Sequence, residues 1–151
     1  MRMSEFAKVA RASMLPTIHL AGVRFGMELG ENEVALVHNL HWYWYGTAAA
    51  GSNSVSFGLF RKTDSLPPNV WSDHTDTIWL IRDSKKFVTE SVSIGGNGNV
   101  VFPAPIPLIR PPQLITQIAV ILTSCIGMRL YYTVQKLTTA DMAKLMAKDH
   151  A

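Results

Sequence analysis

The chain has 151 residues and a formal net charge of +3 at pH 7, and 48% of its residues are hydrophobic while only 17% are charged. This composition excludes a disordered chain, which would carry few apolar residues and much charge, and the length favours one folded domain. The basic residues are scattered along the chain, so charge alone does not predict a nucleic-acid-binding protein. The one cysteine, Cys125, cannot form an internal disulfide, and we expect it to be a buried, unreactive thiol.

The N-terminal segment, residues 1–16, is expected to form a short helix or an arm, because several of its apolar residues fall at helical spacing. Its charged residues interrupt every apolar run, so we expect no secretory signal peptide. Arg2, Lys8 and Arg11 are candidate contacts of this arm with a genome or with a neighbouring subunit. Three charges predict only weak nucleic-acid binding at physiological salt.

Segment 33–45 has the clearest strand pattern, because its side chains alternate between two faces with period two. The two tryptophans of this segment fall on one face, and Val37, Tyr43 and Tyr45 fall on the other. Segment 114–123 is apolar on both faces, which is typical of a strand in the centre of a sheet. Further strands are expected over 17–29, 54–61, 77–81, 87–94, 99–102 and 128–136.

The connections between these strands are polar or rich in glycine and proline. Residues 82–86 predict a polar turn, and the sequence Gly-Gly-Asn-Gly at 95–98 predicts a hairpin turn because these residues tolerate a positive φ. The five prolines within 103–112 leave few backbone donors. We therefore expect this proline-rich segment to be extended and to cross from one sheet to another.

Residues 138–151 predict a C-terminal helix, in which Thr138 is the N-cap and Asp141 stands three residues later. Short strands at near-regular spacing predict an all-β fold, and we expect a two-sheet antiparallel β-sandwich of the jelly-roll type over residues 17–137. The arm, the sandwich and the helix would form one domain. The uncharged stretch 111–128 holds polar residues and begins with two prolines, so we expect no transmembrane segment.

No set of residues in the sequence predicts a chemical reaction. His38 and His41 would point to opposite faces of their strand, so they are not expected to share a metal. Asp73, His74 and Asp76 would offer ligands to a cation, but their spacing matches no recognised site and a solvated loop is the preferred interpretation. The sequence has no serine-hydrolase elbow and no phosphate-binding loop. We therefore expect no enzymatic activity, no catalytic residue, no cofactor and no bound metal.

The aromatic run His-Trp-Tyr-Trp-Tyr at 41–45 is the most unusual feature of the sequence. The preferred interpretation places its tryptophans in the core and its tyrosines under loops, but a sugar-binding platform or a subunit interface would use such a face too. Segments 33–45 and 114–123 carry more apolar surface than one core between two sheets needs, so we expect the surplus to contact neighbouring copies. The candidate interface residues are Val37, Tyr43, Tyr45, Pro103, Pro105 and Pro107.

Three segments resemble the small β-sandwich structural proteins of bacterial and archaeal viruses. They are the aromatic strand 33–45, the proline-rich segment 102–108, and the final strand 128–137 that leads into a helix. The resemblance implies a coat or accessory capsid protein that acts by self-assembly, contacts copies of itself and other virion proteins, and resides in the virion after synthesis in the host cytoplasm. The alternatives are a carbohydrate-binding β-sandwich, which would be cellular or a viral receptor-binding module, a small enzyme on this fold, and a β-sandwich scaffold.

Overall fold

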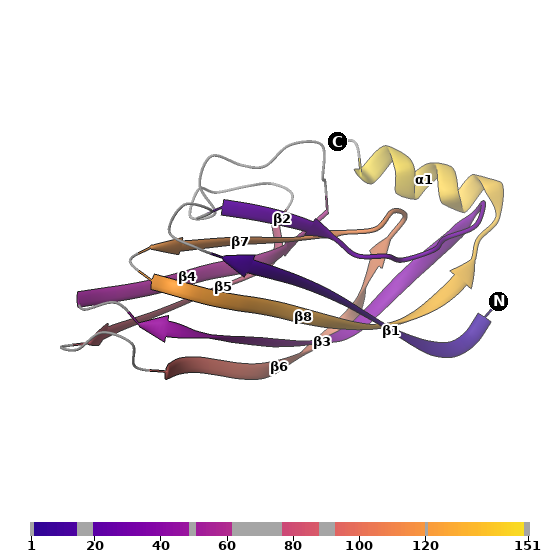
Figure 1. The fold of residues 1–151 in the computed structure, drawn as a ribbon. Coiled ribbons are helices and arrows are strands. Elements are labelled where there is room, and N and C mark those ends of the chain that lie inside the picture. Colours follow the sequence, from indigo (N-terminus) through magenta and orange to yellow (C-terminus); the bar gives the residue numbers. More distant parts are fainter. Residues whose placement is uncertain are drawn as a thin grey trace.

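A computed structural model describes residues 2–14, 20–48, 51–61, 77–87, 93–119 and 121–149 of the chain. These residues form two packed sheets of strands and one C-terminal helix (Figure 1). The elements are β1 (Arg2–Met14), β2 (Leu20–Arg24), β3 (Glu33–Ala48), β4 (Gly51–Phe60), β5 (Thr77–Phe87), β6 (Ser93–Leu108), β7 (Gln113–Ala119), β8 (Ile121–Lys136) and α1 (Thr139–Asp149).

The strand order is that of a jelly roll. Sheet I has the order β1-β8-β3-β6, and sheet II has the order β2-β7-β4-β5. The strands pair antiparallel from the two ends of the chain inward: β1 with β8, β2 with β7, β3 with β6, and β4 with β5. This nesting rolls one long hairpin into two sheets. The expected two-sheet antiparallel β-sandwich is therefore confirmed.

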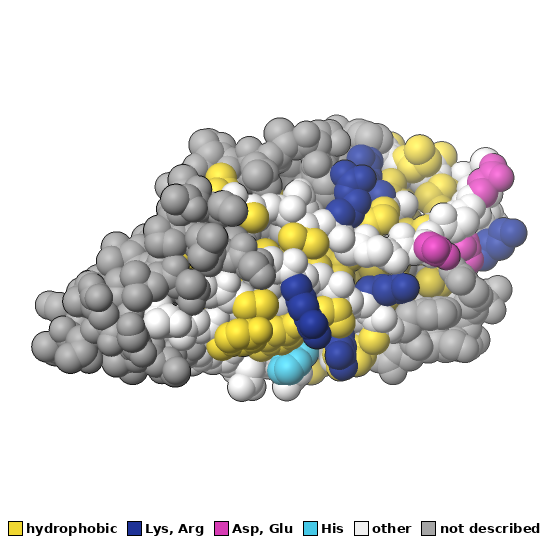
Figure 2. Space-filling model, in the orientation of Figure 1, with side chains coloured by type: hydrophobic (Ala, Val, Ile, Leu, Met, Phe, Trp, Pro, Cys, Tyr) yellow, Lys and Arg dark blue, Asp and Glu magenta, His cyan; other side chains and the backbone are white. Residues whose placement is uncertain are grey.

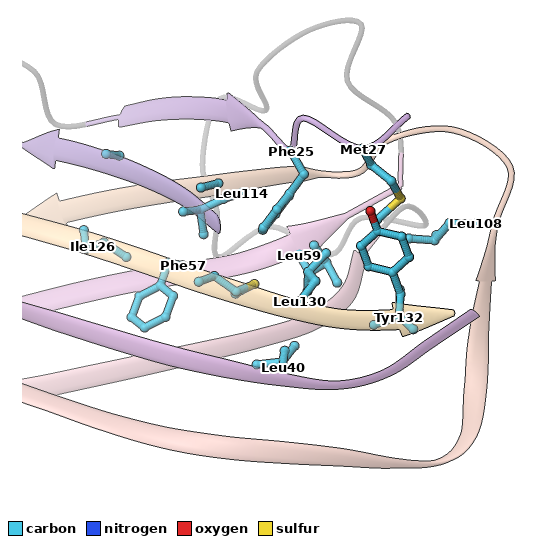
Figure 3. Close-up of a cluster of buried hydrophobic side chains, with 14 of the residues drawn as sticks. Phe25, Met27, Leu40, Phe57, Leu59, Leu108, Leu114, Ile126, Leu130 and Tyr132 are labelled. Carbon is cyan, nitrogen blue, oxygen red and sulfur yellow. The ribbon is translucent and has the colours of Figure 1, made fainter. Parts of the chain in front are cut away.

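The core lies between the two sheets, where side chains from both inner faces meet (Figure 3). Leu40 and Leu130 of sheet I and Phe57 and Leu114 of sheet II are fully buried there. The two tryptophans of β3 also face this core, as expected. Trp44 is buried in it, and Trp42 is partly buried and packs against the core cluster.

A β-bulge in β3 changes which residues face the core. The register of β3 against both of its neighbours shifts between Val37 and Asn39. Because one extra residue reverses the alternation of side chains, Val37 is fully buried in the core and does not share the outer face with the tyrosines of β3. The prediction that Val37 belongs to a subunit interface is wrong. The bulge also puts His38 within 2.8 Å of the hydroxyl of Thr133. Both His38 and His41 therefore lie on the outer side, and their expected placement on opposite faces is wrong.

Residues 2–14, the described part of the predicted N-terminal segment, form neither a helix nor an arm. β1 is an edge strand of sheet I and pairs with β8 from Met14 back to Arg2, with an irregularity between Arg2 and Phe6. Ala10 and Ala12 are buried against the core. Two small residues in alternate positions are a weak signal for a strand, and the helical spacing of the apolar residues in this short segment was misleading.

The two segments expected to be turns, 82–86 and 95–98, lie inside strands. Residues 82–86 continue β5 opposite β4, and the glycine-rich residues 95–98 begin the pairing of β6 with the aromatic part of β3. Trp42 faces Gly98 across the sheet, and a Cβ at Gly98 would lie 2.8 Å from atoms of its indole ring. The glycines of β6 therefore make room for the large rings of β3, which is a packing role and not a turn.

The apolar segment 114–123 is not one strand. Its first part belongs to β7 in sheet II, and its last part begins β8 in sheet I. Ile115 faces away from the central core, yet it is buried within the single chain beside Phe60. We had expected the apolar surface of this segment to be buried by a neighbouring copy. At Ile115 it is buried within the chain itself, so this residue needs no second copy.

The C-terminal helix and the proline-rich segment have the expected character. The hydroxyl of Thr138 accepts a hydrogen bond of 3.2 Å from the backbone amide of Asp141, so the predicted N-cap is confirmed. The proline-rich residues 103–107 belong to β6, an edge strand of sheet I, where missing backbone donors are tolerated. β6 bends toward the other layer before it leads into β7, so the predicted crossing lies at its end (Figure 1).

Candidate functional site

The outer face of sheet I carries the candidate functional residues. Figure 2 shows hydrophobic, basic and histidine side chains together on one face of the molecule. Four consecutive rows of paired residues cross the strands β1, β8, β3 and β6 at the positions of this face. In that strand order they are Ser13–Cys125–Tyr45–Gly95, Arg11–Gly127–Tyr43–Asn97, Val9–Arg129–His41–Asn99 and Ala7–Tyr131–Asn39–Val101.

Tyr43 lies flat across the neighbouring strand β8. A Cβ at Gly127 would overlap the end of the Tyr43 ring, so only glycine leaves room for it there. On the far side of β8, Nε of Arg11 donates a hydrogen bond of 2.7 Å to the Tyr43 hydroxyl. The ring of His41 stands 6.2 Å from that of Tyr43 on the same face. Residues of three strands therefore surround Tyr43: Arg11 of β1, Gly127 of β8 and His41 of β3.

Tyr45 is the most exposed aromatic side chain of this face, with 60% of its surface accessible. Its phenol hydrogen-bonds with the thiol of its cross-strand partner Cys125, and this contact raises the pKa of Tyr45 above its ordinary value. The charge that the thiol acquires on ionisation raises the pKa of Tyr45 further. Cys125 is partly exposed, so our expectation of a buried thiol is wrong.

Replacing Cys125 by alanine is expected to lower the pKa of Tyr45, because the hydrogen bond that favours the neutral phenol is lost. A phenol whose pKa is raised by folding adds stability below its unfolded pKa, and this stability is lost as the pH rises through the folded value, above about pH 10. An absorbance titration of tyrosine measures the shift, and Tyr45→Phe identifies which transition belongs to Tyr45. An unchanged midpoint in Cys125→Ala would contradict the contact.

The charges described on this outer face have one sign. Arg11 and Arg129 stand on it beside His41, and the described side chains of its four rows include no aspartate or glutamate. The side chain of Glu5, also in β1, lies outside the described part. In Figure 2 the acidic side chains lie toward one end of the visible face, and the histidine lies beside basic and hydrophobic side chains nearer its middle. The face is therefore aromatic and cationic at once.

A second candidate surface lies along the edge strand β6. Val101 has 75% of its surface accessible, and Pro103 and Pro105 are exposed beyond it. Pro107 is half-buried, and its carbonyl oxygen accepts a hydrogen bond of 2.9 Å from Nη1 of Arg61. This apolar edge, residues 101–105, carries no charged residue.

The structure separates the other predicted site residues. Lys8 and Arg11 lie in β1, and their register against β8 places them on opposite faces of the sheet, so they do not form one basic arm. Arg2 begins the same strand, and its side chain lies outside the described part. The loop with Asp73, His74 and Asp76 also lies outside the described residues.

Arg129 is the functional candidate that the sequence did not single out. It belongs to β8, far along the chain from the aromatic run, and it reaches the outer face only because β8 pairs with β3. The period-two alternation of strand 128–136 predicts that Arg129 points outward. Knowing that this strand pairs with 33–45 would have been enough to place Arg129 beside the aromatic run.

The described residues offer neither a metal site nor a membrane-spanning helix. Those residues contain no group of three or more histidine, cysteine or acidic side chains placed to hold a metal. They also contain no helix long and apolar enough to cross a membrane.

When the chain is compared with protein-family models and with curated proteins, it matches none of them. Any assignment of function therefore rests on the fold and on these two surfaces.

Proposed function

We propose that this protein is a virion structural protein, a coat or accessory capsid protein that acts by self-assembly. The observation that carries the proposal is the strand order β1-β8-β3-β6 packed on β2-β7-β4-β5. This is the eight-stranded jelly roll, an architecture used by viral capsid proteins and by lectin domains. The resemblance of three segments to virion β-sandwich proteins favours the first of these two uses.

The apolar edge of β6 is the surface that we assign to subunit contacts. Val101 is largely exposed there, and proline in an edge strand prevents continuous strand addition while leaving apolar side chains available for packing. The outer face of sheet I suits a contact between identical faces poorly, because Arg11 and Arg129 of two copies would be brought together without an acidic partner among the described side chains. The predicted interface residues therefore belong to two surfaces. Tyr43 and Tyr45 lie on the outer face of sheet I, and the prolines lie on the edge of β6, which we assign to self-assembly.

Electron microscopy of the purified protein tests the proposal directly, since a coat protein is expected to form rings or shells at high concentration. Val101→Gln is expected to reduce the yield of these particles, because fully burying a valine side chain contributes about 1.5–3 kcal/mol to each contact. The fold should not change, because the side chain is already exposed. Light scattering measures the loss of assembly.

Val9→Gln is the matched control, since it makes the same change on the opposite edge strand of sheet I, where the valine is also exposed. Particle yield should stay the same in this variant. A wild-type protein that remains a monomer at high concentration would overturn the proposed function. Equal losses in both variants would overturn the assignment to the β6 edge.

A carbohydrate-binding module is the second candidate. Exposed Tyr45 beside the flat ring of Tyr43 favours it, because aromatic rings on a sheet face offer stacking surfaces to a sugar. A glycan array separates the two functions: specific binding of one glycan, together with a monomeric protein, would support the module.

A further inference from the structure

The outer face of sheet I arranges three kinds of side chain in columns along the strands. The β3 column holds His41, Tyr43 and Tyr45, which repeat at about 6.8 Å because alternate residues of a strand share a face. On the β1 and β8 side of this column stand the two arginines of the face, and on the β6 side stand two exposed asparagines. The flanking residues are Arg11, Arg129, Asn97 and Asn99.

The aromatic column is accessible and fixed in place. Tyr45 is mostly exposed, and Tyr43 is fixed over Gly127 by the hydrogen bond from Arg11. That bond uses Nε of Arg11, and no other bond of its guanidinium to a described residue is seen, so its two terminal nitrogens can bind an anion. Arg129 is exposed beside His41.

From this arrangement we propose that the outer face of sheet I binds single-stranded nucleic acid. Bases stack on the aromatic column, phosphates contact Arg11 and Arg129, and the amides of Asn97 and Asn99 meet the edges of the bases. Aromatic rings next to a cationic track are what sequence-tolerant binding of a single strand requires. The proposal rests on the proposed function, since a packaged genome is the nucleic acid that a virion protein encounters.

Charge complementarity decides between this ligand and a second copy of the chain. The described side chains of the face include arginine and histidine but no carboxylate, so they attract a polyanion and repel an identical face. A neutral glycan would use the tyrosines but would leave the two arginines without a role. A single strand uses all three columns.

Fluorescence anisotropy with labelled dT20, labelled U20 and a 20-base-pair DNA duplex tests the proposal at low protein concentration. We expect both single strands to bind more tightly than the duplex. Tyr45→Ser should weaken single-strand binding about 5- to 100-fold, as the loss of one stacking ring does in other proteins. Circular dichroism should show an unchanged fold, because the replaced ring is largely exposed.

Salt dependence tests the arginines separately. If two phosphates are neutralised, the slope of log affinity against log salt should be about −1.4, and Arg129→Gln should reduce it to about −0.7. Lys144→Gln is the matched control, because it removes the same charge from an exposed position on helix α1. The slope of this control should match that of the unaltered protein.

Three results would overturn the proposal. They are duplex binding as tight as single-strand binding, an equal reduction of the salt slope in Arg129→Gln and Lys144→Gln, and no oligonucleotide binding at low salt. Glycan binding that depends on Tyr45 would replace it with the carbohydrate module. Particles that form while the subunits bind no oligonucleotide would overturn this inference alone. Oligonucleotide binding by a protein that never forms particles would overturn the proposed function alone.

Discussion

Replacing Leu130 by alanine is expected to lower the free energy of unfolding by about 2–5 kcal/mol, the range for removing a fully buried leucine side chain from a packed core. Leu130 has none of its surface exposed and lies on β8, the strand between β1 and β3 in sheet I. It faces Leu40, which is equally buried, across the sheet. Since domains of this kind are stable by only about 5–15 kcal/mol, the variant should show a large shift in its urea midpoint, measured by tryptophan fluorescence.

Leu80→Ala is the matched control for this prediction. Leu80 lies on the edge strand β5 with 37% of its surface exposed, so the same chemical change creates no closed cavity. We expect a loss clearly smaller than that of Leu130→Ala. Equal losses at the two positions would contradict the placement of the core between β8 and sheet II.

Gly98→Ala is expected to lower the free energy of unfolding by about 1–3 kcal/mol, although alanine is normally the better residue in a strand. The new Cβ would lie 2.8 Å from three atoms of the Trp42 indole. That ring cannot move freely, because its centroid is 5.7 Å from that of Phe57 and 6.4 Å from that of Trp79. Urea unfolding measures the loss, and near-ultraviolet circular dichroism should report a displaced tryptophan.

Gly26→Ala provides the comparison for this glycine. A Cβ at Gly26 would have no neighbouring atom within 4 Å, so the substitution should be neutral or stabilise the protein by up to about 1 kcal/mol through the unfolded state. If Gly98→Ala were as well tolerated as Gly26→Ala, the packing of the Trp42 ring over β6 would be wrong.

The two candidate surfaces adjoin on the molecule, because β6 contributes to both. Its Asn97 and Asn99 face the aromatic column of β3, and the apolar edge begins at Val101. A shell that closes through this edge would therefore place neighbouring cationic faces next to one another. Weak binding of a single strand by one subunit would then be reinforced by many subunits along the same polymer.

Local sequence patterns determined the class of fold and much of the candidate site. Period-two alternation in 33–45 predicted a strand and placed its tryptophans inward and Tyr43 and Tyr45 outward, because the side chains of a strand alternate whatever it pairs with. The hydroxyl of Thr138 and its spacing from Asp141 located the start of the helix, because capping depends on neighbours three residues apart.

Only the tertiary structure decided which strands pair and in which register. The bulge after Val37 reverses the faces of β3. The glycines before Val100 leave room for indole rings that lie more than fifty positions earlier in the sequence, and Arg129 stands opposite His41 on the neighbouring strand. These relations join residues far apart in the sequence, and an alternating pattern carries no information about its partner strand or about a one-residue shift. The helical reading of the N-terminal residues failed for the same reason, since β1 is stabilised as a strand by its pairing with β8.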